Sequence, residues 1–163
     1  MLRERFEAIL AALTACCVEV YGGRLVSLAV FGSVARGTMR PDSDIDVLLV
    51  VDALPNGRLR RVAEFEPVEQ RLAPLLAASA REGIHTTLSP MFKTPAELAY
   101  GSPLFLDMTE EVLILHDRDA VLSRYLDGLR ARLQALGARR IPKGGGYYWL
   151  LKPDLKPGED FTL

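Results

Sequence analysis

Apolar residues recur along the first twenty positions at the three- and four-residue spacing of a helix that buries one side. The repeat is formed by Leu2, Phe6, Ile9, Leu10, Leu13, Cys17 and Val20. This period predicts an α-helix, and Gly22-Gly23 is typical of its end. The same periodicity returns over Arg58–Arg81, where we expect a second long helix that Pro67 and Pro74 break or kink.

Short apolar runs predict the strands. The expected strands are Leu25–Phe31, Asp44–Val51, Ile84–Ser89 and Val112–Leu115. Helical pieces are expected at Pro95–Ala99 and Pro103–Glu110. This order predicts an α/β (α+β) fold, a small mixed β-sheet with helices packed on one side.

A stripe of leucines marks the last expected helix. It is formed by Leu122, Leu126, Leu129, Leu133 and Leu136, at alternating spacings of four and three. Such a stripe suits a helix that covers the open face of a sheet. It also suits helix–helix docking with a partner or a second copy of the chain, so a homo-oligomer is the alternative interpretation.

Two carboxylates begin the second expected strand. Because residues i and i+2 of a strand share a face, Asp44 and Asp46 point to one spot while Ile45 points into the core. Paired carboxylate oxygens suit Mg²⁺, which completes its shell with water and substrate phosphates.

A glycine and a serine directly follow the first expected strand. Gly32 lets the backbone come close to a ligand, because it has no Cβ. The Ser33 hydroxyl and the free N–H groups of the next turn can then hold a phosphate. The sequence therefore predicts a phosphate cradle and a metal site at the ends of neighbouring strands.

Together these segments resemble a known family. Phe31-Gly32-Ser33, about ten residues, and then Asp44-Ile45-Asp46-Val47 is similar to the fingerprint of the nucleotidyltransferases of the DNA polymerase β superfamily. Within that superfamily the chain resembles the minimal nucleotidyltransferase (MNT) group. The resemblance covers Leu25 to about Val51 and otherwise only the order of elements.

The resemblance implies transfer of a nucleoside monophosphate from a nucleoside triphosphate, with ATP expected, to an acceptor hydroxyl. Asp44 and Asp46 would hold two Mg²⁺ ions, with Mn²⁺ as an alternative. Gly32 and Ser33 would bind the nucleotide through its β- and γ-phosphates. Arg36 would add a cation near the triphosphate, or is a solvated loop arginine.

The family pattern has a third carboxylate on a later strand, but the segment Ile84–Ser89 contains no Asp or Glu. The acid would be expected at Thr87 or a neighbour. Asp107 falls in a segment expected to be helical, and His85 is either a base or a structural residue. Two alternatives stay open: an active nucleotidyltransferase, or a catalytically silent antitoxin or adaptor that binds a nucleotide or a partner.

The resemblance also implies a partner. Stand-alone MNT proteins are often paired with a helical protein of the HEPN type, and some act as antitoxins by nucleotidylating it. The acceptor would then be a protein hydroxyl such as that of a tyrosine, while small antibiotics are acceptors elsewhere in the superfamily.

Composition and charge limit the classes of partner. With 163 residues, 49% hydrophobic, we expect one core: a nucleotidyltransferase domain over residues 1–140 and a C-terminal tail over 141–163. With a net charge of −1, the chain has no overall positive charge that would attract long nucleic acid. Seven basic residues against two acidic ones over Arg118–Lys143 are a solvated face, or a site for RNA or an acidic partner.

The termini and cysteines indicate a compartment. Cys16 and Cys17 are adjacent in the first helix, where they make poor disulfide partners, so both are expected to be reduced. Charges interrupt the N-terminal segment, and no run reaches the length of a membrane span, so we expect no membrane association and a cytoplasmic protein.

The tail contains an aromatic cluster, Tyr147–Leu151, with the only tryptophan. Gly144–Gly146 before it is expected to be a flexible joint. We expect the tail to fold back over the domain. An acceptor-side lid or a docking peptide is the alternative.

Overall fold

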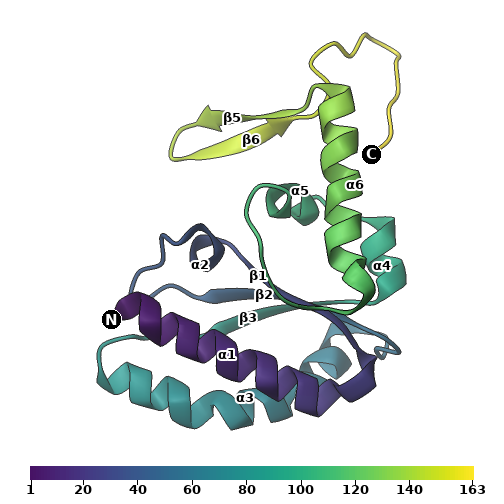
Figure 1. Cartoon of the computed structure of the whole chain (residues 1–163). Helices are drawn as coiled ribbons and strands as arrows, with labels where there is room; N and C mark the ends of the chain where they lie inside the picture. The colour runs from purple at the N-terminus through teal and green to yellow at the C-terminus, as the bar shows by residue number, and fades with distance from the viewer.

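The apolar run Leu25–Phe31 forms β1, the strand around which the sheet is built. In the computed structural model, which describes all 163 residues, β1 pairs antiparallel with both β2 (Ile45–Val51) and β4 (Leu113–Asp117). β3 (Leu88–Lys93) adds to the outer side of β2 in parallel. The order β3-β2-β1-β4 is the mixed sheet that the sequence predicts (Figure 1).

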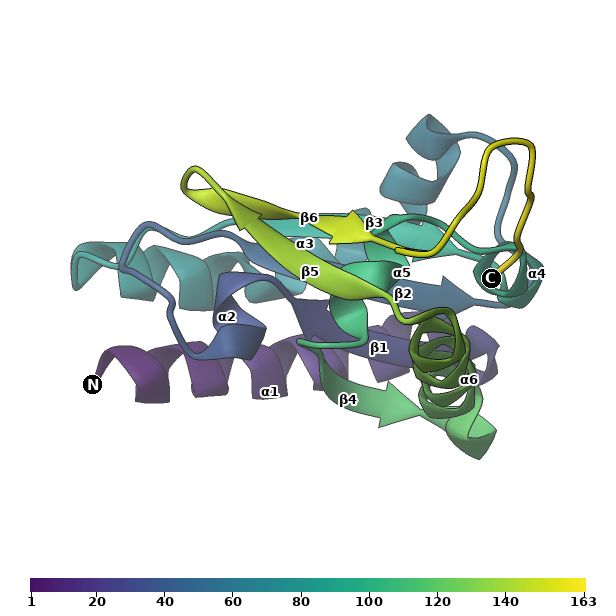
Figure 2. The ribbon, with the colours of Figure 1, turned by 90° about the horizontal axis from the view of Figure 1, so that it is seen from above.

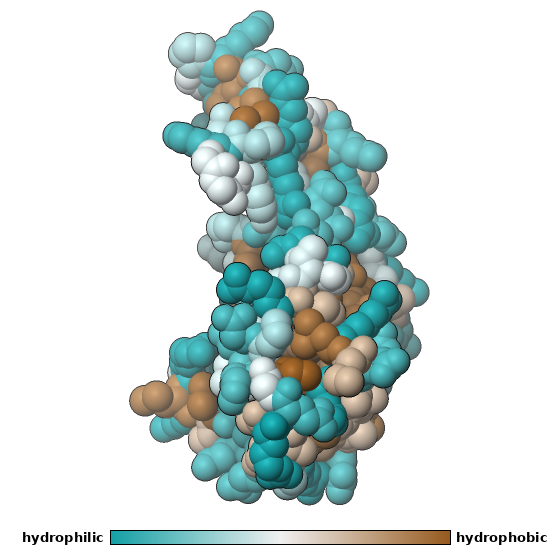
Figure 3. Space-filling model, turned by 90° about the vertical axis from the view of Figure 1, so that its left-hand side faces the viewer, coloured by the Kyte–Doolittle hydropathy of each residue, from teal (hydrophilic) through white to brown (hydrophobic).

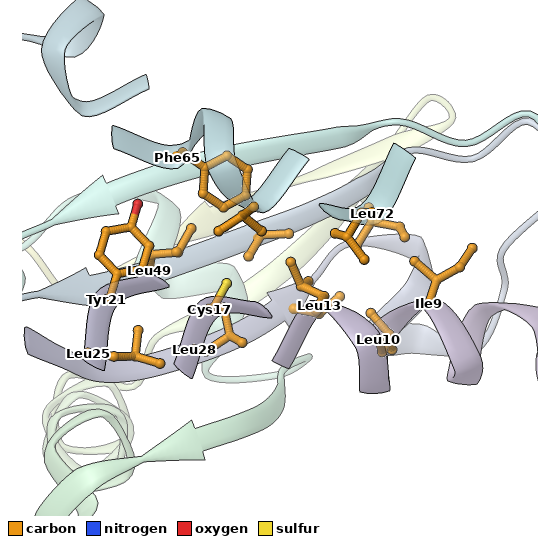
Figure 4. Packing of buried hydrophobic residues seen from close by; sticks show 14 of the residues in the cluster. Ile9, Leu10, Leu13, Cys17, Tyr21, Leu25, Leu28, Leu49, Phe65 and Leu72 are labelled. Carbon is orange, nitrogen blue, oxygen red and sulfur yellow. The ribbon is translucent and has the colours of Figure 1, made fainter. Parts of the chain in front are cut away.

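One face of the sheet is covered by two long helices, α1 (Leu2–Tyr21) and α3 (Arg58–Arg81). Their apolar side chains meet those of Ile45, Val47 and Leu49 in a first core cluster. Figure 4 shows this packing from close by, with Leu13 and Cys17 of α1 near the sheet and Phe65 and Leu72 on α3. Cys17 is buried and both cysteines are free thiols, as expected. Burial raises the pKa of the Cys17 thiol to about 12.

The other face is covered as well, which differs from the one-sided arrangement that the sequence suggested. α4 (Pro95–Tyr100), α5 (Leu104–Met108) and α6 (Val121–Leu136) lie there. They form a second core cluster with Leu48 and Val50 of β2. Because β1 and β2 carry apolar side chains on both faces, each face must be removed from water. Figure 1 shows α1 and α3 on one side of the sheet, and α4, α5 and α6 on the other.

β3 differs from the prediction in where it begins, and α3 differs in being continuous. β3 begins four residues later than the expected strand and runs through Pro90. This position is tolerated because β3 lies at an edge of the sheet, where one row of backbone groups has no partner strand. α3 continues through Pro67 and Pro74 without a break. Each proline removes one backbone hydrogen bond, but the other hydrogen bonds of the helix and its packing against α1 hold it together.

α1 together with the turn Gly22–Arg24 is long and apolar enough to cross a membrane, by length and composition alone. This differs from the expectation that no run of the chain reaches the length of a membrane span. In this structure the apolar stripe of α1 lies in the first core cluster, and 33% of its most apolar stretch is buried.

The leucine stripe of α6 covers the sheet. Leu122, Leu126, Leu129 and Leu133 are all buried in the second core cluster. The first of the two explanations therefore accounts for this stripe, and a homo-oligomer stays a prediction.

The C-terminal segment contains structure of its own. β5 (Arg139–Lys143) and β6 (Gly146–Leu150) form an antiparallel hairpin, here called the hairpin. The expected flexible joint is its tight turn at Gly144-Gly145, and the hairpin begins before the predicted boundary at residue 141. Figure 2 shows it crossing above the sheet. Beyond it, Leu163 lines an apolar cavity of about 340 Å³ with Tyr100 and Leu129.

Asp117 ties the end of β4 to β1 and to α6. Its carboxylate accepts hydrogen bonds from the Ser27 hydroxyl (2.7 Å), from the N–H groups of Leu122 and Ser123 (2.9 Å each) and from the Ser123 hydroxyl (2.7 Å). Burial by itself would raise the pKa of Asp117, but these hydrogen bonds outweigh it and hold the pKa below its ordinary 3.8. The carboxylate thus provides a hydrogen-bond acceptor both for the buried Ser27 hydroxyl and for N–H groups in the first turn of α6.

We predict that Asp117→Ala lowers the free energy of unfolding by about 1–2 kcal/mol, because a helix cap and the partner of Ser27 are lost together. This corresponds to roughly 2–8 °C in Tm. Since the folded pKa is depressed, the stabilisation is present at neutral pH and lost as the pH falls below 3.8. Asp127→Ala, on the exposed side of α6, is the control, and equal losses in the two variants would contradict the assignment.

Candidate functional site

The turn after β1 and the start of β2 meet at one end of the sheet. The antiparallel register pairs Phe31, the last residue of β1, with Asp46. Gly32 therefore lies beside Asp46, and the short helix α2 (Ser33–Arg36) begins directly after it. The structure thus brings Gly32, Ser33 and Asp46 together, as the sequence predicts for a strand pair of this kind.

Gly32 is in close contact with the Asp46 carboxylate. Its φ of +74° lies in the region that favours glycine. A Cβ added there would lie 2.4 Å from Asp46 Oδ2, so any larger residue would push the carboxylate aside. The predicted freedom of the Gly32 backbone therefore serves, in the folded chain, to admit the acidic side chain of the neighbouring strand.

α2 is a single tight turn that places Arg36 on the same side as the carboxylates. The Arg36 N–H donates to the Gly32 carbonyl (3.1 Å), and the Thr38 N–H donates to the Ser33 carbonyl (3.0 Å). Gly37 ends the turn in the left-handed conformation, and Val34 is buried beneath it.

Figure 3 looks at the side of the molecule on which the N-terminus lies and shows an apolar patch among polar atoms. An apolar hollow of about 460 Å³ opens between α1 and α2.

Asp44 lies just before β2 and is exposed. The Thr87 hydroxyl donates a 2.7 Å hydrogen bond to Asp44 Oδ1, and the Ile45 N–H donates to the Thr87 carbonyl. The parallel register also sets Ser89 beside Asp46. Hydroxyl groups therefore stand next to both carboxylates, at the place where the sequence analysis expected the third acid.

No third acid joins the pair. No group of three or more His, Cys, Asp or Glu side chains is placed to hold a metal ion. His85 is exposed and precedes β3, with its backbone N–H bonded to the Pro41 carbonyl. Asp107 lies in α5, as expected from its helical segment, and binds Arg140 and Trp149.

The two carboxylates repel each other. Burial raises the pKa of Asp46, and the charge of Asp44 raises it further, while Arg36 pulls it down. A divalent cation would relieve this repulsion, and its remaining ligands can be water and phosphate oxygens. The donor set of Asp44 and Asp46 therefore fits Mg²⁺ or Mn²⁺.

Arg36 is held by an acid that the sequence analysis did not single out. Its Nη1 donates to Glu111 Oε2 at 3.0 Å, while Glu111 Oε1 accepts from Arg140 Nη1 at 2.9 Å. Burial by itself would raise the pKa of Glu111, but the hydrogen bonds from Arg140 and Arg36 outweigh it and lower the pKa. Arg36 is therefore paired with an acid, with its side chain 42% exposed.

Arg140 belongs to the interior of this network, which corrects its interpretation as part of a basic face for RNA. Its side chain is only 20% exposed and also contacts Asp107 (3.5 Å) and the Tyr147 hydroxyl (3.1 Å). Its guanidinium lies 4.1 Å from the centre of the Tyr147 ring. Glu111 and Arg140 lie 75 and 104 residues after Arg36 in the chain, so no local pattern could have joined them.

Comparison with protein families places the chain among known sequences. Residues 12–93 match the model of the nucleotidyltransferase domain family, a range that contains both the Gly32-Ser33 turn and the Asp44/Asp46 pair. The candidate protein adenylyltransferase MJ1305 of Methanocaldococcus jannaschii is 31% identical over 116 residues, which are 70% of this chain and 74% of that protein.

Solved structures share parts of the fold at low similarity. A crystal structure of a toxin–antitoxin with AMP-PNP is 18% identical, has a TM-score of 0.39, and is matched over 83% of this chain and 94% of that chain. A mutant of the toxin–antitoxin MntA–HpeT is 16% identical, with a TM-score of 0.43 over 72% of this chain and 87% of that chain. Likeness at this level carries no argument about function.

We predict that Asp46→Asn stabilises the protein in the absence of metal, because it removes a partly buried charge from a like-charged pair. An acid whose folded pKa is raised stabilises the fold below its unfolded pKa, and that contribution is lost as the pH rises through the folded value. At pH 7 we expect Tm to rise by about 1 °C or more. The control is Asp42→Asn, whose carboxylate is exposed. A clear fall in Tm for Asp46→Asn at pH 7 without metal would contradict the argument.

Proposed function

The chain belongs to the nucleotidyltransferase domain family, and on that premise we propose that it transfers adenosine monophosphate from Mg²⁺-bound ATP to a hydroxyl of a protein. The observation that carries the proposal is the contact of the Asp46 carboxylate with the Gly32-Ser33 turn, beside Asp44. This arrangement sets a carboxylate pair against a turn suited to phosphate.

Asp44 and Asp46 are the residues that would hold the metal. Bound Mg²⁺ would supply charge stabilisation for the displacement at the α-phosphate. Thr87 fixes the orientation of the Asp44 carboxylate through its hydroxyl. The Gly32 backbone limits the positions open to the Asp46 carboxylate. Both ligands are thus held in place before any substrate enters, which lowers the cost of ordering them.

Ser33 and Arg36 are the residues that would bind the triphosphate. The Ser33 hydroxyl and the neighbouring backbone N–H groups can donate to the β- and γ-phosphates, which keeps the leaving pyrophosphate in place. Arg36 is close enough to Asp46 to lower its pKa, so its charge acts within the same site. It would offset part of the negative charge that builds up on the leaving group.

A protein hydroxyl is the proposed acceptor because the curated relative MJ1305 is named as a candidate protein adenylyltransferase. That name also supports ATP as the nucleotide. The resemblance to the MNT group makes a helical HEPN-type protein the first acceptor to test, in an antitoxin-like pairing. A tyrosine on such a partner would supply the attacking oxygen.

No third carboxylate of this chain joins Asp44 and Asp46 in a group that could hold a metal ion. The hydroxyls of Thr87 and Ser89 flank the pair instead. Neither is basic at neutral pH, so we propose that the acceptor protein or solvent takes the proton of the attacking hydroxyl. The alternative is a silent protein that binds nucleotide or partner without turnover.

The test of the proposal is transfer of label from α-labelled ATP to a co-expressed HEPN-type protein in the presence of Mg²⁺. We predict that Asp44→Asn and Asp46→Asn each lower the rate about a hundredfold or more, since each removes a metal ligand. Asp42→Asn, two residues before Asp44, should keep the wild-type rate. Mg²⁺-dependent ATP binding without transfer to any protein would favour the silent alternative.

A matched pair of glycine variants tests the role of the turn. Gly32 and Gly37 have the same φ of +74°, but only Gly32 would place a Cβ against Asp46. Gly37, with ψ 19°, lies in the left-handed region, where alanine costs about 1 kcal/mol, whereas Gly32, with ψ −152°, lies in a region almost restricted to glycine, so Gly32→Ala carries the larger backbone cost. We predict that Gly32→Ala alone also abolishes Mg²⁺-ATP binding, measured by calorimetry. Equal binding by the two variants would contradict the role given to the Gly32–Asp46 contact.

A further inference from the structure

A single carboxylate, that of Glu111, joins the nucleotide site to the C-terminal hairpin. It binds Arg36 of α2 through one oxygen and Arg140 of β5 through the other. We propose that the hairpin is a working part of the nucleotide site, and that Glu111 is a positioning residue that couples Arg36 to the hairpin. The inference rests on the proposed function, because it concerns how this site holds its nucleotide.

The geometry of the link favours coupling over a chance surface contact. The side chains of Glu111 and Arg140 are only 23% and 20% exposed, so water screens this pair weakly, while the Arg36 side chain at the other end of the link is 42% exposed. Because each Glu111 oxygen bonds to one arginine, a shift of either guanidinium changes the carboxylate that the other one uses. An isolated exposed ion pair would have neither property.

The hairpin depends on this link for its position. A two-stranded hairpin is at best marginally stable by itself, so its attachments decide where it lies. Its attachments are Arg140, which binds Glu111 and Asp107, and Trp149, whose Nε1 donates to Asp107 at 2.9 Å. The Trp149 side chain also packs against the second core cluster. Figures 1 and 2 agree that the hairpin passes over α5.

Charge balance explains how a nucleotide would act on the hairpin. Arg36 and Arg140 are compensated by Glu111 and Asp107, and Arg140 Nε is buried without a partner. A triphosphate at Ser33 competes with Glu111 for Arg36. When Arg36 moves toward the phosphates, Glu111 is left to Arg140 alone, and the Arg140–Trp149 contact of the hairpin changes with it.

Trp149, the only tryptophan, makes this coupling measurable. Mg²⁺-AMP-PNP is titrated into the full chain, with its binding followed by calorimetry and the hairpin followed by Trp149 fluorescence. In the wild type we expect a fluorescence change that saturates with the same Kd as the heat of binding. Glu111→Gln removes the carboxylate that competes with the phosphates for Arg36, so in this variant we expect about fivefold tighter binding and loss of most of the fluorescence change.

Two further variants make the test specific. Asp127→Asn removes the carboxylate of the Arg130–Asp127 ion pair on α6, outside this network, and should leave both signals unchanged. Arg140→Gln cuts the link at the hairpin, so it should lose the fluorescence change even if Glu111→Gln fails to fold.

The possible results distinguish a failure of the Glu111 coupling from a failure of nucleotide binding. Heat of binding in the wild type with no Trp149 response, or an unchanged Kd and response in Glu111→Gln and Arg140→Gln, would overturn the coupling and leave the nucleotide site standing. Absence of any heat in the wild type would overturn both.

Discussion

The carboxylate of Asp46 lies against the backbone of Gly32, and the site depends on this contact. It exists because β1 and β2 pair antiparallel with Phe31 opposite Asp46, so that the end of one strand and the start of the other share an edge. A slip of one residue in this register would turn Asp46 into the first core cluster and Ile45 toward the site. Because β2 is apolar on both faces, the cost of that slip would come mainly from burying the Asp46 charge in the first core cluster.

The two core clusters hold this register from opposite sides. Ile45, Val47 and Leu49 are buried against α1 and α3, while Leu48 and Val50 are buried against the helices of the other face. Asp46 belongs by alternation to the second face, but it lies near the start of β2 and its side chain is only partly buried. Placing a charged pair at such an edge costs stability, as the raised pKa of Asp46 indicates. Carboxylates with a perturbed pKa are common at functional sites.

Two arginines, Arg36 and Arg140, are linked to this acidic pair. Arg36 acts on Asp46 directly, and Glu111 joins Arg36 to Arg140. Segments from the two halves of the chain therefore share one electrostatic network. Glu111, Arg140 and the hairpin lie outside residues 12–93, the range that matches the family model.

The sequence by itself determined the elements and the chemistry of the pair. Helical spacing, apolar runs and the Gly32-Ser33 to Asp44/Asp46 spacing are local, because they follow from the periods of helix and strand and from the backbone freedom of glycine. Only the tertiary structure decided that helices cover both faces, that β3 runs through Pro90 and that the glycine turn closes a hairpin. It also decided that Glu111 bridges two arginines. These features depend on which distant segments come into contact. Those contacts are determined by the need to bury both faces of the sheet and to pair charges that are removed from water.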